Sequence, residues 1–353
     1  MSRFFSQRLS SLVPYTPGEQ PQDMQYIKLN TNESPFPPAP KVRQVLEERA
    51  ELLRLYSDPE CKVVRKETSR VFGVPEDWII MNNGSDETLN FAFMAFADDS
   101  HPLVFPDITY GFYPVFADLN HIPYTEIPLT EDYEIRPEEY YGIGKTICLA
   151  NPNAQTGVAL PAAAIEEIVK RNPDNMVIID EAYVDFGGES VVPLVKKYDN
   201  LLVIGTFSKS RSFAGGRLGF GIGRPELIAD LNTIRYSTNP YNINSLTEYA
   251  GAAILKENDY YMNNCKKIMA NRSYASDALR ALGFRVLPSC SNFILAGDGP
   301  VDGETLYQKL KAMGVLVRHF DKERIRNYCR ITVGTREQMD ILLDKVKTIL
   351  AEV

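Results

Sequence analysis

The sequence contains only three histidines, five cysteines and one tryptophan. The histidines, at positions 101, 121 and 319, are too far apart in the chain to suggest a metal site, so we expect no bound metal. The cysteines are odd in number and show no CxxC spacing. This predicts reduced thiols in a cytosol-like compartment, and hence a cytoplasmic protein.

Long apolar runs and an excess of basic residues are also missing. No run approaches the ~20 apolar residues of a membrane helix, and Arg8 and polar residues interrupt the N-terminal segment where a signal peptide would have its core. The net charge of −8 argues against a nucleic-acid or anionic-membrane partner. A chain of 353 residues is long enough for one large and one smaller domain.

Short, continuous apolar runs alternate with helical patterns through the middle of the chain. Continuous runs are typical of parallel strands covered on both faces, and they lie at residues 78–81, 103–105, 146–149, 176–179 and 201–204. Residues 219–223 alternate instead, which favours an antiparallel partner. From about Tyr261 the pattern changes to a long helix, a strand and a final helix with a capping box at Thr335. We therefore predict an α/β domain followed by a smaller α+β domain.

The domain boundaries follow from these changes in pattern. Residues 1–27 are expected to form an N-terminal arm and residues 53–260 the large domain. The proline-rich segment 34–40 separates the first strand candidate from the next helix. We expect residues 28–52 to join residues 261–353 in the small domain.

One lysine, Lys209, directly follows a serine behind the apolar run 201–204, and a glycine-rich turn leads on to Arg217. The run predicts a buried strand that holds Lys209 at a fixed point, while Ser208 and Arg217 suit a phosphate. A lysine in such a site can form a Schiff base with an aldehyde, and pyridoxal phosphate is the phosphorylated aldehyde that fits. The alternative is a surface Ser-Lys pair in a basic loop, which the glycine-rich continuation disfavours.

This segment resembles the lysine motif of fold-type I pyridoxal-phosphate enzymes, most closely the branch of the histidinol-phosphate aminotransferases. The resemblance extends from about Tyr15 to Val353. Further segments match in the family order: residues 29–33, 83–87, 110–113, 151–157, 180–183, 291–293 and 330–336. The resemblance implies a large domain with a mostly parallel seven-stranded sheet, a smaller α+β domain, bound pyridoxal phosphate and a homodimer.

The segment Gly84-Ser85-Asp86 lies between a predicted strand and a predicted helix. Unpaired backbone N–H groups and the helix dipole make such a junction an anion site. A helix N-cap role would also explain Ser85. The resemblance implies that this turn holds the cofactor phosphate together with Ser208 and Arg217.

Asp180 ends the apolar run 176–179, at the sheet edge where ligands bind in open α/β sheets. A carboxylate there would pair with the pyridine nitrogen and keep it protonated, although a structural aspartate is the alternative. The resemblance implies that Tyr183 donates to the ring's phenolate oxygen and that Tyr110 stacks on the ring. Simple packing would also explain Tyr110.

The resemblance also supplies the residues expected at the substrate end. It assigns Arg330 to the substrate's acidic group, which a guanidinium binds bidentately, and Asn32 and Asn292 to further substrate contacts. Tyr15 and Tyr56 match tyrosines that reach the neighbouring subunit's site in relatives.

The chain departs from the family at Ala154 and Gln155, where relatives usually carry Asn-Pro. That asparagine donates to the phenolate oxygen, and alanine cannot. Either Tyr183 acts alone or Asn153 reaches in with a shifted backbone. The loss of a donor is expected to raise the pKa of the Schiff base, because the phenolate is less well stabilised.

The sequence therefore predicts a pyridoxal-phosphate-dependent aminotransferase with Lys209, Asp180 and Tyr183 as catalytic residues. The expected donor is histidinol phosphate or an aromatic amino acid, with 2-oxoglutarate as acceptor. One alternative is a decarboxylase or lyase of the same fold, such as a threonine-phosphate decarboxylase, which would share every cofactor residue. A non-catalytic regulator is disfavoured, because the chain has neither a spare domain nor a basic face.

Overall fold

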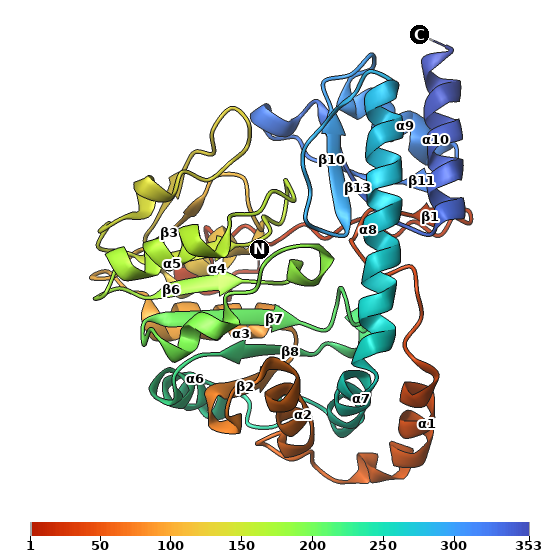
Figure 1. The fold of residues 1–353 in the computed structure, drawn as a ribbon. Helices are drawn as coiled ribbons and strands as arrows, with labels where there is room; N and C mark the ends of the chain where they lie inside the picture. The colour runs from red at the N-terminus through yellow and green to blue at the C-terminus, as the bar shows by residue number, and fades with distance from the viewer. Residues whose placement is uncertain (1, 353) are drawn as a thin grey trace.

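The computed structural model describes residues 2–352 and contains a large sheet with helices on both faces (Figure 1). Its seven strands run in the order β2-β8-β7-β6-β5-β3-β4. Only β8 is antiparallel to its neighbours, and all other pairs are parallel. The strands are β2 (Ile79–Asn82), β3 (Leu103–Pro106), β4 (Tyr124–Ile127), β5 (Thr146–Ala150), β6 (Val177–Asp180), β7 (Leu201–Thr206) and β8 (Gly219–Ile222). The predicted fold class is confirmed.

The continuous apolar runs become strands that are buried on both faces. Alternate residues of β5 to β7 enter two separate cores, since Cys148 belongs to one and Ile147 and Leu149 to the other. The first core includes α3 (Ser85–Phe96), α4 (Phe112–Asn120) and α6 (Pro225–Thr238). The second includes α2 (Lys62–Phe72), α5 (Ala162–Arg171) and α7 (Ser245–Lys256).

The C-terminal region forms a smaller antiparallel sheet in the order β12-β13-β10-β9, with helices packed against it. Its elements are α8 (Asn258–Ala281), β9 (Arg285–Val286), β10 (Phe293–Gly297), α9 (Gly303–Ala312), β12 (Arg318–His319), β13 (Tyr328–Thr332) and α10 (Arg336–Leu350). The predicted capping box opens α10, since the side chains of Thr335 and Gln338 each accept the other's backbone N–H.

The segment before the large domain is divided between the two regions. Strand β1 (Ile27–Lys28) pairs in parallel with β11 (Val315–Leu316) of the small region, as expected. Helix α1 (Pro40–Arg49) packs against α7 instead, far from β1 (Figure 1). Its buried Val42 shares the core of the large region. The prediction that residues 28–52 join the small domain as a whole is therefore wrong for α1.

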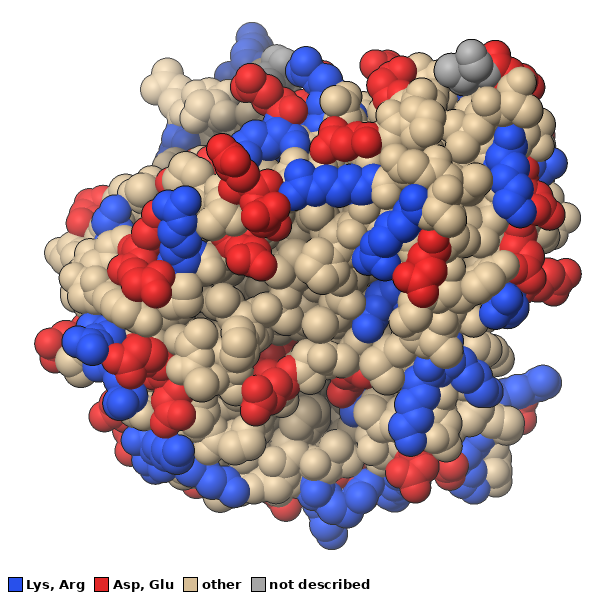
Figure 2. Space-filling view, turned by 45° about the horizontal axis from the view of Figure 1, so that its top comes forward, with Lys and Arg blue, Asp and Glu red and all other residues tan. Residues whose placement is uncertain are grey.

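Short 3-10 helices lie in the connections: η1 (Gln7–Leu9), η2 (Ala50–Arg54), η3 (Glu76–Trp78), η4 (Pro137–Tyr140), η5 (Val184–Phe186), η6 (Val192–Lys196), η7 (Ala214–Gly216) and η8 (Glu323–Ile325). Basic and acidic side chains are interspersed on the face drawn in Figure 2, with no large field of one sign. None of the helices between residues 2 and 352 is long and apolar enough to cross a membrane.

The topology brings distant segments to one edge of the large sheet. The parallel strands β5, β6 and β7 all end there, and the antiparallel β8 begins there. Asp180 is the last residue of β6, and Lys209 follows β7 by three residues. Ligands of open α/β sheets bind at this edge.

Candidate active site

A cavity of about 180 Å³ opens at the carboxyl edge of the large sheet. Most of the residues proposed from the sequence for the cofactor line it: Ser85, Asp86, Tyr110, Asp180, Tyr183, Ser208, Lys209 and Arg217. The other lining residues are Thr31, Glu33, Ala154, Ala182, Thr206 and Ala214. The structure therefore brings together segments that lie more than a hundred residues apart.

One end of the cavity has the features of an anion site. Gly84 is the N-cap residue of α3 with φ of 80°, so the alternative that Ser85 caps this helix is wrong. A Cβ atom at Gly84 would lie 2.6 Å from Arg217 Nη2 and would displace the guanidinium, and the positive φ independently favours glycine. The N-terminus of α3, the Ser208 hydroxyl and Arg217 could together hold a phosphate.

Asp86 links this end to the aromatic wall. It accepts hydrogen bonds from Arg217 Nη2 at 3.0 Å and from the Tyr110 hydroxyl at 2.7 Å. Burial and the Asp86 charge raise the pKa of Tyr110 well above its usual value, so this tyrosine stays neutral. Its ring is thereby fixed in the cavity wall.

Asp180 lies deep in the cavity, with 4 % of its surface exposed. Its Oδ1 accepts the Ala182 N–H at 3.1 Å, and its Oδ2 accepts the Tyr113 hydroxyl at 3.1 Å. Burial raises the pKa of Asp180 to about 6, although both hydrogen bonds and the charge of Lys209 oppose the rise. A cationic nitrogen beside this carboxylate would stabilise its ionised form.

Tyr113 was missed in the sequence, although its motif was recognised through Tyr110. Tyr113 lies in the first turn of α4, three residues after Tyr110, which precedes the helix, and its backbone N–H donates to the Tyr110 carbonyl at 3.2 Å. That spacing was the available signal.

Lys209 Nζ lies 3.4 Å from the carbonyl oxygen of Thr31 and 5.8 Å from the centre of the Tyr183 ring. The Tyr183 hydroxyl accepts a hydrogen bond from Asn32 Nδ2 at 3.1 Å. The backbone N–H of Asn32 donates to Thr332 Oγ1, and Asn32 Oδ1 accepts from the same hydroxyl, both at 2.9 Å. The Asn32 carbonyl accepts from Asn292 Nδ2 at 2.9 Å. The small region thus orients the tyrosine beside the lysine.

Three asparagines predicted to contact ligands have other partners. Asn32 is buried, uses both ends of its side-chain amide on Tyr183 and Thr332, and does not line the cavity. Asn292 is fully buried and donates to the backbone of Asn32, so it does not line the cavity as a substrate contact. Asn153 Nδ2 donates to the carbonyl of Ile108, and its Oδ1 accepts the N–H groups of Gln155 and Thr156. The alternative that Asn153 replaces the missing donor is wrong, because its amide nitrogen donates to Ile108 and only its amide oxygen is used within its own turn. Ala154 lines the cavity instead.

Arg330 is the central residue of β13 in the small sheet. Its Nη1 donates to the carbonyl of Ala154 and to Gln155 Oε1, both at 3.1 Å, while the rings of Phe293 and Phe320 lie 5.2 and 5.3 Å from it. Its Nε is buried and has no hydrogen-bond partner between residues 2 and 352. Burial lowers the pKa of Arg330.

Arg318 is a second cation that the sequence analysis overlooked. It pairs with Arg330 in register across β12 and β13, and it donates to the carbonyls of Thr16 and Pro17 at 3.1 and 3.2 Å. It could have been recognised only by knowing the register of the two strands.

Of the two tyrosines expected to reach a neighbouring subunit, Tyr15 lies beside the cavity of its own chain and Tyr56 lies on the surface. Tyr15 stacks on Phe112 of its own chain at 4.1 Å and lies 6.4 Å from Tyr110, so the structure places it beside its own site, contrary to expectation. Tyr56 is 83 % exposed and stacks on Tyr241 at 4.5 Å, outside the cavity.

Comparison with known proteins agrees with this arrangement. Residues 24–346 match the family described as aminotransferase class I and II. The chain is 47% identical over 352 residues to a histidinol-phosphate aminotransferase of Brachyspira hyodysenteriae, with 99% of each chain covered. It is 43% identical to that of Clostridium beijerinckii over 99% of this chain and 98% of the relative. The solved structure of histidinol-phosphate aminotransferase from Sinorhizobium meliloti in complex with pyridoxal-5′-phosphate has a TM-score of 0.90 at 22% identity, covering 100% and 99% of the two chains.

The chain therefore belongs to the class I and II aminotransferases. It is a pyridoxal-phosphate-dependent aminotransferase, as the sequence predicted. The decarboxylase alternative is not favoured, because the full-length relatives at 42–47% identity are named histidinol-phosphate aminotransferases. An L-threonine-O-3-phosphate decarboxylase from Porphyromonas gingivalis shares the fold, at 22% identity with a TM-score of 0.81.

Proposed function

We propose that the chain transfers the amino group of histidinol phosphate to 2-oxoglutarate, with pyridoxal phosphate attached to Lys209. The observation that carries this proposal is the meeting of Lys209, Asp180 and Arg217 in one cavity. Relatives at 42–47% identity over nearly the whole chain are named histidinol-phosphate aminotransferases.

The cavity residues fit the chemical groups of the cofactor. The Asp180 carboxylate would hold the ring nitrogen, and the Tyr183 hydroxyl would bind the phenolate oxygen. Gly84 leaves room for Arg217, which with Ser85 and Ser208 would bind the phosphate. When bound, the cofactor supplies an electron sink for the carbanion at the substrate Cα.

The protein's own residues would move the proton and keep the ring in place. Lys209 Nζ would take the proton from the substrate Cα as a general base. Tyr183, held by Asn32, would keep its hydroxyl beside this amine. Tyr110, fixed by Asp86, would stack on the ring.

The substrate end requires cations, because histidinol phosphate and 2-oxoglutarate both carry acidic groups. Arg330 has a buried Nε without a partner among residues 2–352, and a guanidinium binds carboxylate or phosphate bidentately. Arg318 lies opposite it on the next strand and would add a second positive charge. Tyr15, beside Tyr110, would close this end of the cavity.

We further propose a cytoplasmic homodimer in which Tyr56 reaches the neighbouring site. Tyr56 is exposed together with the apolar side chains of Leu53, Leu55 and Tyr241. An exposed group of this kind is typical of a protein interface.

The test combines chemical labelling with a substrate screen. Borohydride reduction and peptide mapping should place the cofactor on Lys209, and Lys209→Ala should lose the label while a control, Lys28→Ala, keeps it. Label on another lysine would refute the assignment. Histidinol phosphate should convert the cofactor to its amine form, and 2-oxoglutarate should restore it. Carbon dioxide release without an acceptor would instead identify a lyase.

A further inference from the structure

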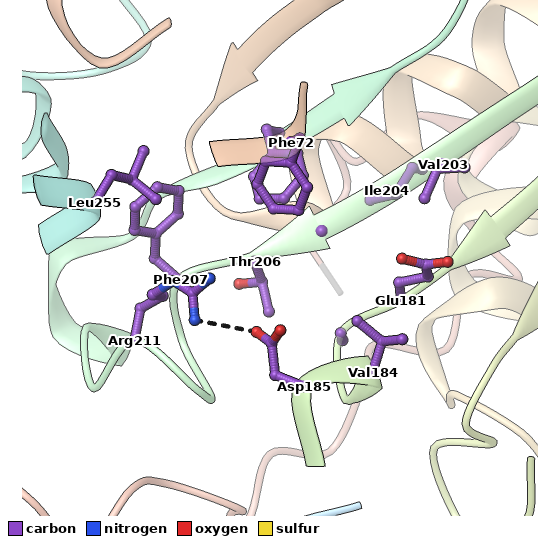
Figure 3. A pocket seen from close by; sticks show the side chains of 13 residues that line it. Phe72, Glu181, Val184, Asp185, Val203, Ile204, Thr206, Phe207, Arg211 and Leu255 are labelled. Carbon is purple, nitrogen blue, oxygen red and sulfur yellow. Dashed lines mark hydrogen bonds and ion pairs between the residues drawn. The ribbon is translucent and has the colours of Figure 1, made fainter. Parts of the chain in front are cut away.

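An ion pair with a buried arginine joins the segment that carries Lys209 to the segment that carries Tyr183. Arg211 Nη1 donates to Asp185 Oδ2 at 3.2 Å (Figure 3). The same oxygen accepts the Ser210 hydroxyl at 2.5 Å. Arg211 follows Lys209 by two residues, and Asp185 follows Tyr183 by two residues. The pair therefore connects the two segments close to the residues that face each other in the cavity.

The burial of Arg211 distinguishes this ion pair from the others. Its side chain is 6 % exposed, the lowest value for the cation of any ion pair among residues 2–352. Asp185 is 29 % exposed, so the pair is only partly buried. Removing the Arg211 charge from water costs several kcal/mol, so the pair is weak support for stability. A role in fixing position accounts better for a buried arginine at this point.

The surroundings leave the pair little freedom. The backbone turns back on itself here, because Phe213 N–H donates to the carbonyl of Phe207 at 3.0 Å, and Ser212 has a φ of 52°. The space beside the pair is lined by Arg211, Asp185, Glu181 and Phe207 among others (Figure 3) and measures about 20 Å³. That is room for about one water molecule, so the arginine cannot easily adopt another position.

We propose that Arg211 and Asp185 are positioning residues that set the place of Lys209 Nζ relative to the Tyr183 hydroxyl. The inference rests on the proposed attachment of the cofactor to Lys209. Neither residue touches the reacting atoms, since neither lines the cofactor cavity. They act by holding the two turns at a fixed separation, and Ser210 supports Asp185 in this role.

The experiment uses the loaded enzyme and three variants: Asp185→Asn, Arg211→Lys, and the double variant Asp185→Asn with Arg211→Met, which leaves no unpaired buried charge. Asp277→Asn, which breaks an exposed ion pair with Arg280, is the matched control. Measurements are the pH titration of the cofactor's visible absorbance, kcat and KM, borohydride labelling, and thermal unfolding without cofactor.

We expect Asp185→Asn and the double variant to lower kcat about 10-fold or more, because small displacements of reacting groups are costly, with a much smaller change in KM. The midpoint of the absorbance titration should also shift. Arg211→Lys keeps the positive charge, so it should change kcat and this midpoint less than the other two variants do. Asp277→Asn should change neither. A double variant with the wild-type titration and kcat would overturn the inference, whatever its thermal stability. Labelling separates the two proposals, since absence of label on Lys209 in the wild-type protein would refute the proposed function instead.

Discussion

Replacing Asp180 by asparagine should make the cofactor-free protein more stable near neutral pH. Burial raises the pKa of Asp180 from 3.8 to about 6. The folded protein therefore keeps this proton at a higher pH than the unfolded chain does. The stabilising contribution of the protonated group is complete below about pH 4 and is lost as the pH rises through about 6. A difference of ~2 pKa units corresponds to about 3 kcal/mol.

Asparagine carries no charge and avoids this loss. Its amide oxygen can still accept the Ala182 N–H, and the Tyr113 hydroxyl can accept from the amide nitrogen. The stability difference between Asp180→Asn and wild type should therefore grow by up to about 3 kcal/mol between about pH 4 and pH 8. With pyridoxal phosphate bound, this increase in the stability difference with pH should become smaller or change sign, because the ring nitrogen stabilises the ionised carboxylate.

Urea unfolding at several pH values, with and without cofactor, measures both effects. Glu181→Gln is a matched control, since burial raises the pKa of Glu181 to about 8 but its carboxylate is bound by Ser190 and Val191 outside the cofactor cavity. Its pH effect should not depend on the cofactor. A stability difference for Asp180→Asn that is constant with pH would refute the reasoning. Single-turnover removal of the Cα proton at the wild-type rate would show that Asp180 is structural.

Two further predictions concern the departure from the family pattern. Ala154→Asn should lower the midpoint of the cofactor's absorbance titration by of order one pH unit or less, because the new amide would stabilise the phenolate from the cavity wall. An unchanged titration in a folded variant would show that Tyr183 and Asn32 already suffice. Gln155→Ala should raise KM for the acidic substrates about 10-fold, because it removes the hydrogen bond that holds Arg330 Nη1 in position. A hydrogen bond to a charged group is worth roughly 1.5–3 kcal/mol. Steady-state kinetics would check this, and an unchanged KM would contradict it.

The sequence predicted the parts of the site that depend on one segment at a time. Lys209 and Asp180 each follow an apolar run, and parallel strands end at a common edge, so their meeting required only the fold class. Ser85 and Arg217 were recognisable because glycines flank them and leave space for a close backbone approach.

Contacts between distant segments could not be predicted. Asn32 reaches Tyr183 across 151 positions, and Arg318 lies beside Arg330 only because β12 and β13 pair in that register. The error at Asn153 has a different origin. Its amide oxygen completes a local turn and its amide nitrogen bonds the carbonyl of Ile108, and composition does not reveal which way an amide points.

Asp180 and Arg330, at the two ends of the site, are buried charged groups without an ion-pair partner among residues 2–352, unlike the buried Arg211. Arg211 has its counterion within the chain, at Asp185. Asp180 and Arg330 have no ion-pair partner among residues 2–352, and burial shifts the pKa of each toward its neutral form. Because an uncompensated buried charge is costly, a ligand of opposite sign would stabilise each end. A cationic ring nitrogen at Asp180 and an anionic substrate group at Arg330 would meet both requirements together, and ligand binding would then contribute to the stability of the site.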